Sequence, residues 1–387
     1  MCSLFAVIYR ELREIVKRPL YIISSLGVMV FVTVFFITFL DQGLPQEQPI
    51  GVIDHDHSTF SRTVIQEIAN TQPVHLVGEY ANFSEARAAM QRGEIYVFFE
   101  IPEGLYEDLL TQKQPKVTVY SSYGLMVGSM LAYKQIRTML TVLSAGVQRQ
   151  VLRARGLTDQ QIMAVIQPIV LDHHALGNPW TSYAIYLLTT ILPGILGMMI
   201  TLLSVFTITR EIKRHTSHRW VETAGGSIPV AILGKLLPYT IYFSILGFAL
   251  NLVMFKVLEY PMGGSFWFQN LAMMCYLYAM QGVAVTIVGF VPQSKLAISI
   301  TSLFTVLSIS LSGFTYPVDS MYPAFQALCH LTPLRHYYLI TVNQTLIGLP
   351  VAKSLIQIAA LMVFWLVPFL FNSRLKKAFV DYAFPIS

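Results

Sequence analysis

The sequence has little charge. Only 12% of its 387 residues are Asp, Glu, Lys or Arg, whereas an ordinary soluble domain has about 25%. The shortage is uneven, because 24 of these 47 residues lie between positions 41 and 180, which leaves 23 for the other 247 positions. This pattern excludes a soluble enzyme, a disordered chain and a fibrous protein. It indicates a membrane protein that carries one water-soluble insert.

Cysteine and nucleotide-binding motifs are also scarce. The chain has three cysteines, Cys2, Cys275 and Cys329, and their spacing predicts neither a disulfide framework nor a metal site. Gly234-Lys235 is not part of a phosphate-binding loop, because Leu236 follows where such a loop has Ser or Thr, and the earlier glycine is missing at the required spacing. We therefore expect that the chain is not an enzyme, that it has no catalytic residues and that it binds no cofactor itself.

The insert contains acidic and histidine residues that could suggest a metal site. These are Asp54, His55, Asp56, His57, His75, His173 and His174. Asp and His at the end of a strand are more typical of turns and helix caps, and no zinc-binding spacing accompanies them. We therefore expect no metal site here.

Apolar runs of about 20 residues are the signature of membrane-spanning helices. Six such runs are present, at residues 20–40, 181–209, 231–256, 266–291, 296–315 and 351–372. They predict a polytopic α-helical membrane protein with six transmembrane helices. The first run is longer than the roughly 7–15 apolar residues of a signal peptide, so we expect it to remain as an anchor.

Lys and Arg residues indicate the orientation. They gather before the first run, between the second and the third, and in the tail at 373–387. Cytoplasmic loops are enriched in these residues, so both termini should be cytoplasmic and residues 41–180 periplasmic, in a bacterial inner membrane. The same bias explains the net charge of +5, and we expect no nucleic acid partner.

Residues 1–19 predict a cytoplasmic helix that lies on the membrane surface. Apolar and charged residues occupy separate faces of this segment: Phe5, Ile8, Leu12 and Ile15 on one, and Arg10, Arg13 and Glu14 on the other. Such a helix contacts membrane lipid through its apolar face.

Residues 41–180 predict an inserted extracytoplasmic α/β domain with a mainly parallel or mixed sheet. Strands are expected at 50–53, 74–77, 95–101 and 117–120, and helices at 60–70, 84–92 and 104–110. A long helix over 125–155 and a second one through about 166 follow. These two helices could form a stalk that joins the domain to the membrane, or a lid over its core.

The spans contain few polar residues. Candidates for lining a translocation pathway are Asn251, Gln281, Thr301, Thr305 and Ser308. The alternative is that these side chains serve helix packing, which is the usual role of small hydroxyl residues in membranes.

The loop at 210–230 mixes charges of both signs with a tryptophan. Its candidate functional residues are Arg210, Glu211, Arg214, Trp220 and Glu222. This composition suggests a short surface helix that docks onto another protein. The alternative is a basic loop that only fixes the topology.

The order of these features resembles the permease subunits of ABC exporters of the ABC-2 type, in particular the subgroup with a large periplasmic domain between the first and second spans. The resemblance covers essentially the whole chain. Besides the Arg-rich start, it is carried by Ile50-Gly51-Val52-Ile53-Asp54-His55-Asp56, Ser61-Arg62, Glu85-Ala86, Gly93, Ile101-Pro102, Ala154-Arg155-Gly156-Leu157, Arg210-Glu211, Gly234-Lys235-Leu236-Leu237-Pro238-Tyr239, Ser312-Gly313, Tyr316-Pro317 and Pro333.

The resemblance implies roles for two segments. The loop at 210–230 would be the coupling helix that docks into a nucleotide-binding subunit, with the five residues named above as its contacts. Here His215 stands where the family has glycine, and residues 217–219 are additional, so the detailed geometry of the family does not carry over. Residues 316–350 would form an external re-entrant segment, which suits their prolines and tyrosines.

The resemblance also implies partners and a mechanism. They are a second permease chain (identical or a sister), two ABC ATPase subunits that use ATP and Mg²⁺, and in Gram-negative relatives a periplasmic adaptor and an outer-membrane channel. Alternating access would move a hydrophobic or amphipathic substrate, drug-like or lipid-linked, out of the cell. The rival hypotheses are a non-transporting receptor or assembly factor, and a lipid-modifying enzyme. The enzyme is disfavoured because the spans show no cluster of buried acids, bases or nucleophiles.

Overall fold

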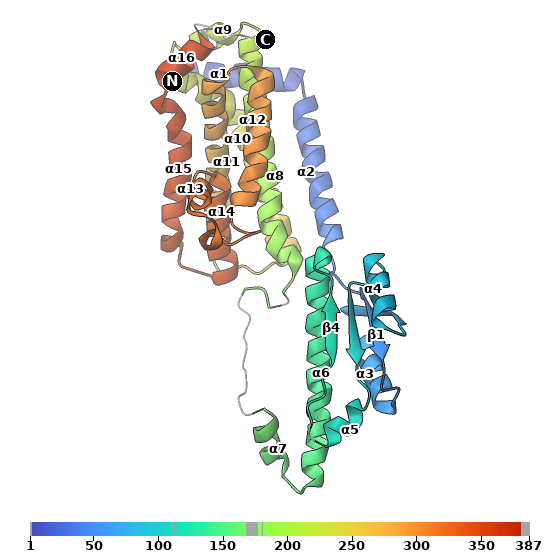
Figure 1. The fold of residues 1–387 in the computed structure, drawn as a ribbon. Helices are drawn as coiled ribbons and strands as arrows, with labels where there is room; N and C mark the ends of the chain where they lie inside the picture. The colour runs from blue at the N-terminus through green and yellow to red at the C-terminus, as the bar shows by residue number, and fades with distance from the viewer. Residues whose placement is uncertain (1, 112, 168–176, 180, 381–387) are drawn as a thin grey trace. The chain divides into compact units, whose positions relative to one another are not determined.

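The structure, a computed structural model, describes residues 2–111, 113–167, 177–179 and 181–380. The chain divides into two compact units, one made of residues 1–43 with 174–387 and the other of residues 44–173. We call them the membrane unit and the inserted unit. Figure 1 shows the helices and strands of both.

The membrane unit is built from helices. Among the described residues, six helical segments are long and apolar enough to cross a membrane. They are α2 (Leu20–Phe39), α8 (Tyr183–Lys213), α10 (Ile228–Leu252) with a π-helical end at Val253–Val257, α11 (Phe266–Phe290), α12 (Ser294–Leu311), and α15 (Leu355–Leu370) with the 3-10 turn Val351–Ser354 before it. The predicted six-span α-helical membrane fold is confirmed.

Shorter helices complete this unit. They are α1 (Cys2–Lys17), α9 (Ser217–Thr223), α13 (Pro323–His330), α14 (Pro333–Thr341) and α16 (Asn372–Phe379), with a 3-10 turn at Val318–Ser320 and a π-helical segment at Val342–Ile347. Proline begins both α13 and α14, where its missing N–H group costs no hydrogen bond. Helices α1, α9 and α16 lie together at one end of the membrane unit (Figure 1).

Helix α11 forms the centre of the membrane unit. It packs against α8, α10, α14 and α15, and its Tyr276 and Met280 are buried beside Leu196 of α8. Gly282 allows α15 to approach, because a Cβ atom at this position would lie 2.2 Å from the carbonyl oxygen of Phe364. Close packing at small residues is the usual way in which helices associate in a membrane.

Helix α2 has the opposite character. Only Ser25 and Met29 of its 20 residues are buried, and large apolar side chains such as Phe31 and Phe39 are each 70% exposed. In water such an apolar surface would promote aggregation. In a bilayer the lipid chains cover it, and this contact carries no free-energy penalty. The exposure pattern of α2 therefore agrees with a lipid-facing span.

The inserted unit contains a four-stranded sheet. Its strands are β1 (Gln48–Asp54), β2 (Val74–Glu79), β3 (Val97–Ile101) and β4 (Thr118–Ser121), in the order β2-β1-β3-β4. Strand β1 is parallel to both β2 and β3, and β4 is antiparallel to β3. The four predicted strands are confirmed to within a few residues, and the sheet is mixed.

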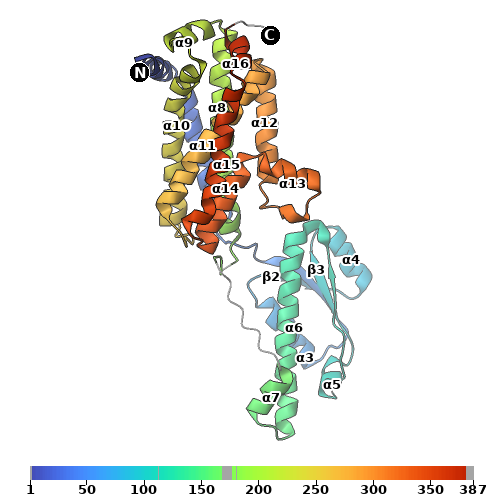
Figure 2. The same ribbon diagram turned by 90° about the vertical axis from the view of Figure 1, so that its left-hand side faces the viewer.

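Helices cover both faces of this sheet. They are α3 (Thr59–Ala69), α4 (Phe83–Gln91), α5 (Leu105–Leu110), α6 (Met126–Ala154, after a 3-10 turn at Tyr123–Leu125) and α7 (Asp159–Ile166). Successive strand residues point to opposite faces, so Phe99 joins the core under α3 and α6 while Phe98 joins the core under α4. Figure 2 shows α4 and α6 on opposite sides of the strands. Ala132 and Ile136 of α6 are fully buried in the first core, so this half of the helix is a lid over the sheet.

Candidate functional site

Helix α1 packs closely on α10. Val7 of α1 is 1% exposed, and Gly234 of α10 makes room for it, since a Cβ atom there would lie 2.8 Å from Val7. The opposite side of α1 is an exposed apolar stripe, made of Phe5, Tyr9, Leu12 and Val16. The helix thus turns a partly polar face towards the protein and an apolar face outwards, as expected for a helix that contacts lipid.

Three helices meet at what we call the ionic cluster, which is made of Arg10, Glu11, Glu211, Lys235 and Tyr239. The Nζ atom of Lys235 lies 2.7 Å from Oε2 of Glu11 and 3.1 Å from Oε1 of Glu211. Arg10 Nη2 donates to both carboxylate oxygens of Glu211 at 2.9 Å. The Tyr239 hydroxyl donates to Glu11 at 2.8 Å. The Lys235 side chain is 0% exposed and the Glu11 side chain 1%.

The ionic cluster is electrically balanced, with two cations and two carboxylates. Leaving one charge of a buried pair without its partner costs about 3–5 kcal/mol, so mutual pairing is what makes this burial possible. A looser ion pair between Arg210 of α8 and Glu14 of α1, at 3.6 Å, lies alongside. Together these contacts tie α1 to the ends of α8 and α10.

The prediction that the spans hold no buried acid or base cluster is wrong. Glu211 and Lys235 lie in the segments long and apolar enough to span a membrane, and both are buried. Glu11 and Lys235 are 224 residues apart in the chain, and nothing local in the sequence pairs them. One signal in the sequence could have indicated this cluster. Lys235 lies in an otherwise apolar run, and charged residues in such runs are rare and usually have a partner of opposite charge.

Trp220 of α9 is fully buried. Its indole N–H donates to the carbonyl oxygen of Ala231 at 3.1 Å, and its ring lies 5.4 Å from that of Phe379 in α16. The Nζ atom of Lys235 lies 5.4 Å from the centre of the indole, a distance at which a cation is attracted to the ring. Trp220 therefore fixes α9 onto the membrane unit and has no surface for a partner.

The outward side of this loop is basic. Its exposed charged or titratable residues, which we call the α9 surface, are Lys213, Arg214, His215, His218, Arg219 and Glu222. Below it, the Thr216 hydroxyl donates to the buried carboxylate of Glu211. Of the five predicted contact residues, Arg214 and Glu222 reach the surface, whereas Arg210, Glu211 and Trp220 support them from inside.

The five polar residues predicted to line a pathway are all buried: Asn251, Gln281, Thr301, Thr305 and Ser308. The hydroxyls of the three α12 residues each donate to a carbonyl one turn earlier in the same helix. Gln281 accepts from Thr240 at 2.6 Å, and Asn251 donates to Asn270 at 3.0 Å. Their hydrogen bonds stay within or between neighbouring helices, so the structure does not gather these residues around one point.

The acidic residues near the end of β1 stabilise a turn and the start of a helix. Asp54 accepts from the amides of Asp56 and His57 at 3.0 and 3.2 Å and from the Ser61 hydroxyl at 2.7 Å. Asp56 in turn accepts from the amides of Gly104 and Leu105, at the start of α5, at 2.8 and 3.1 Å. Among the described residues there is no group of three His, Cys, Asp or Glu placed to hold a metal ion. His173 and His174 lie outside the described residues.

Comparisons with known proteins give one match to a family and one to a curated relative. The model of the family described as ABC-2 family transporter protein matches residues 18–374. Nodulation protein J of Rhizobium leguminosarum bv. viciae is 29% identical to this chain over 111 residues. The matched part is 26% of this chain and 42% of that relative, so the match spans less than half of the relative's length.

Proposed function

This chain belongs to the ABC-2 transporter family, and on that premise we propose that it is the permease subunit of an ATP-driven exporter in a bacterial inner membrane. Members of this family are membrane transport components and not themselves catalysts. We propose that separate ABC ATPase subunits bind and hydrolyse ATP with Mg²⁺, and that they dock at the α9 surface.

The observation that carries this proposal is the placement of the α9 surface directly over the ionic cluster. Thr216 links the loop to Glu211, Glu211 binds Arg10 and Lys235, and these two residues belong to α1 and α10. Separating buried opposite charges is costly, so a push on α9 would move these helices together. If ATP binding brings the ATPase subunits together, the movement would pass through α9 and the ionic cluster to α8 and α10.

The proposed orientation follows from the same end of the unit. Helices α1, α9 and α16 share it, and basic residues are concentrated there, as in cytoplasmic segments. Both termini would be cytoplasmic and the inserted unit periplasmic. A second permease chain would complete the pathway, and an adaptor with an outer-membrane channel would extend it.

The cargo we propose is hydrophobic or amphipathic, and alternating access would move it. The interior hydroxyls of α12, at Thr301, Thr305 and Ser308, are our candidates for the pathway wall, together with Asn251 and Gln281. They are buried in this conformation, so they would have to be uncovered when the helices move.

Co-purification tests the docking. The tagged full chain is expressed in its own bacterium, and ABC ATPase retained on the tag is identified by mass spectrometry and quantified. We expect Arg214→Glu with Arg219→Glu to reduce retention at least tenfold, because both charges are reversed on the surface that would meet the partner. The matched control is Lys353→Glu, an exposed charge in the turn before α15 and outside the α9 surface. An ATPase that never co-purifies, or is retained equally by the double variant, refutes the proposal.

A further inference from the structure

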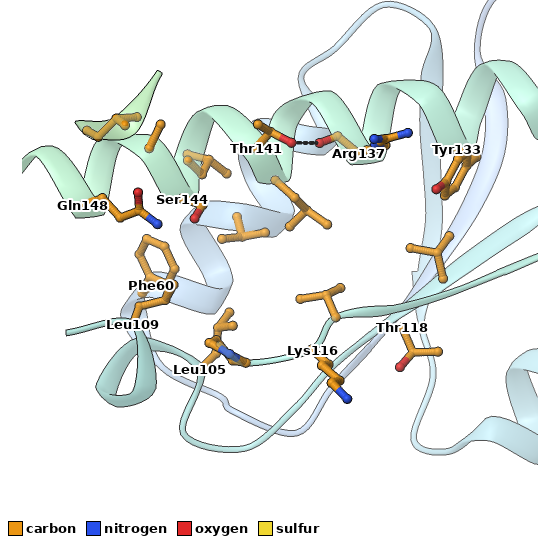
Figure 3. Close-up of a pocket in the computed structure, with 18 residues that line it drawn as sticks. Phe60, Leu105, Leu109, Lys116, Thr118, Tyr133, Arg137, Thr141, Ser144 and Gln148 are labelled. Carbon is orange, nitrogen blue, oxygen red and sulfur yellow. Dashed lines mark hydrogen bonds between the residues drawn. The ribbon is translucent and has the colours of Figure 1, made fainter. Parts of the chain in front are cut away.

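The inserted unit contains an open groove of about 890 Å³ between α6 on one side and α3, α5 and β4 on the other (Figure 3). This volume lies within the range of small-molecule binding sites. Apolar side chains from several elements line it, among them Phe60, Val64, Leu109, Leu140, Leu143 and Ile166.

The charges of the groove differ in sign from those of the region around it. Its lining includes Lys116 and Arg137 but neither Asp nor Glu, although residues 41–180 contain 14 acidic residues and only 10 Lys and Arg. Among the described residues, neither cation has a carboxylate partner. Two unneutralised cations beside an apolar wall favour a ligand that is both anionic and apolar.

The two cations of the groove lie away from its largest apolar side chain, and the polar side chains near Phe60 are the uncharged Ser144 and Gln148. Figure 3 shows Arg137 and Lys116 on opposite walls towards one end, with Phe60 and Leu109 towards the other. Tyr133 lies beyond Arg137 at the polar end. A ligand that matches this gradient has a charged head and an extended apolar tail.

We propose that this groove binds an anionic single-chain amphiphile, of which a long-chain carboxylate is the simplest member. The head group lies between Arg137 and Lys116, and the chain runs along Leu140 and Leu143 towards Phe60. This site goes beyond the proposed transport function and does not rest on it, because binding to the inserted unit requires neither an ATPase nor movement of the spans.

Photolabelling of the full chain tests this site. The protein is placed in phosphatidylcholine nanodiscs without an ATPase, and the probe is a C16 carboxylate with a diazirine at the end of its chain. A C16 primary amine with the same diazirine is the matched probe. We expect the carboxylate to label peptides of α3, α5 and α6 at least fivefold more than the amine does.

Variants separate the charge from the apolar wall. Lys116→Glu with Arg137→Glu should reduce labelling by the carboxylate at least fivefold, and Lys116→Arg with Arg137→Lys should keep it. Lys134→Glu with Arg153→Glu is the matched control, since both residues are exposed on α6 and neither lines the groove.

A third variant blocks the groove without a change of charge. Ala145→Trp places a large side chain among the lining residues and should abolish labelling of α3 and α5. Hydrogen exchange of the strand amides confirms that each variant keeps its sheet. Equal labelling by the amine, or labelling that survives both the charge reversal and Ala145→Trp, overturns the proposal.

Discussion

The two units of this protein use charge in opposite ways. In the membrane unit, Glu11, Glu211 and Lys235 are almost completely buried, and each meets an opposite charge within 3.1 Å. Among the described residues of the inserted unit, the pairs of Lys or Arg with Asp or Glu lie on the surface, where each side chain is at least 33% exposed: Arg92 with Glu94, Lys113 with Asp108, and Arg149 with Asp159. The buried charges of the membrane unit are therefore structural, while the exposed charges of the insert mainly keep it soluble.

The physical reason is the cost of leaving water. A surface pair exchanges one set of favourable contacts for another and contributes about 0–1 kcal/mol, whereas a buried charge without its partner costs several kcal/mol. The same substitution should therefore have effects of very different size in the two units. The four predictions below test this difference.

The largest effect is expected at Lys235. Lys235→Met leaves Glu11 and Glu211 buried with only Arg10 to balance them, and we expect it to lower the free energy of unfolding by about 3–5 kcal/mol. The measurement is the thermal unfolding midpoint of the full chain in nanodiscs. Lys353→Met, at an exposed lysine, should leave the midpoint unchanged. The double variant Lys235→Met with Glu11→Gln keeps the neutral pair of Arg10 and Glu211 and should recover part of the loss, and no recovery would mean that charge balance is not the cause.

A smaller loss is expected at Glu11. Glu11→Gln keeps an acceptor for the Tyr239 hydroxyl, and the excess positive charge that it leaves is shared by Arg10, whose side chain is 29% exposed to solvent. We therefore expect a smaller loss, about 1–3 kcal/mol, in the same unfolding measurement. Glu14→Gln on the same helix is the control, because the Glu14 side chain is 30% exposed and its pair with Arg210 is longer, at 3.6 Å. Equal effects of the two variants would contradict the importance of burial.

Asp54 is the exception that sharpens the comparison, since it is a charged residue of the inserted unit that is 8% exposed. Asp54→Asn cannot accept from Ser61, Asp56 and His57 as a carboxylate does, and we expect a loss of about 1–2 kcal/mol. Hydrogen exchange of the β1 and β3 amides reports the local stability. Glu103→Gln, at an exposed acid, is the control. If both variants change hydrogen exchange equally, then burial does not decide the size of the effect within the inserted unit.

The smallest effect is expected at Arg149. Both side chains of its pair with Asp159 are 54% exposed, so Arg149→Ala should change the stability of the inserted unit by less than about 0.5 kcal/mol. Added salt should remove even this difference, since exposed charges are screened. Hydrogen exchange of α6 and α7 at low and high salt measures it. An effect as large as that of Asp54→Asn would break the comparison.

The fold was largely predictable from the sequence, because its signals are local. About 20 apolar residues in a row indicate a membrane-spanning helix. A short apolar run between turns indicates the strand β1. The structure confirmed six spans and four strands on this basis. The site was predictable only in part. Arg214 and Glu222 reach the surface as a docking loop requires, but tryptophan in a loop suggests an exposed contact, and Trp220 is buried instead.

The sequence by itself determined the membrane class, the number of spans, the inserted α/β unit and the family, since hydropathy and motif order are properties of consecutive residues. The tertiary structure alone decided that Glu11 meets Lys235 across 224 residues, that Trp220 turns inwards, and that Lys116 and Arg137 face one groove. The partner of a buried charge depends on which helices pack together. That packing is settled by the energy of the whole core, and no stretch of the sequence contains it.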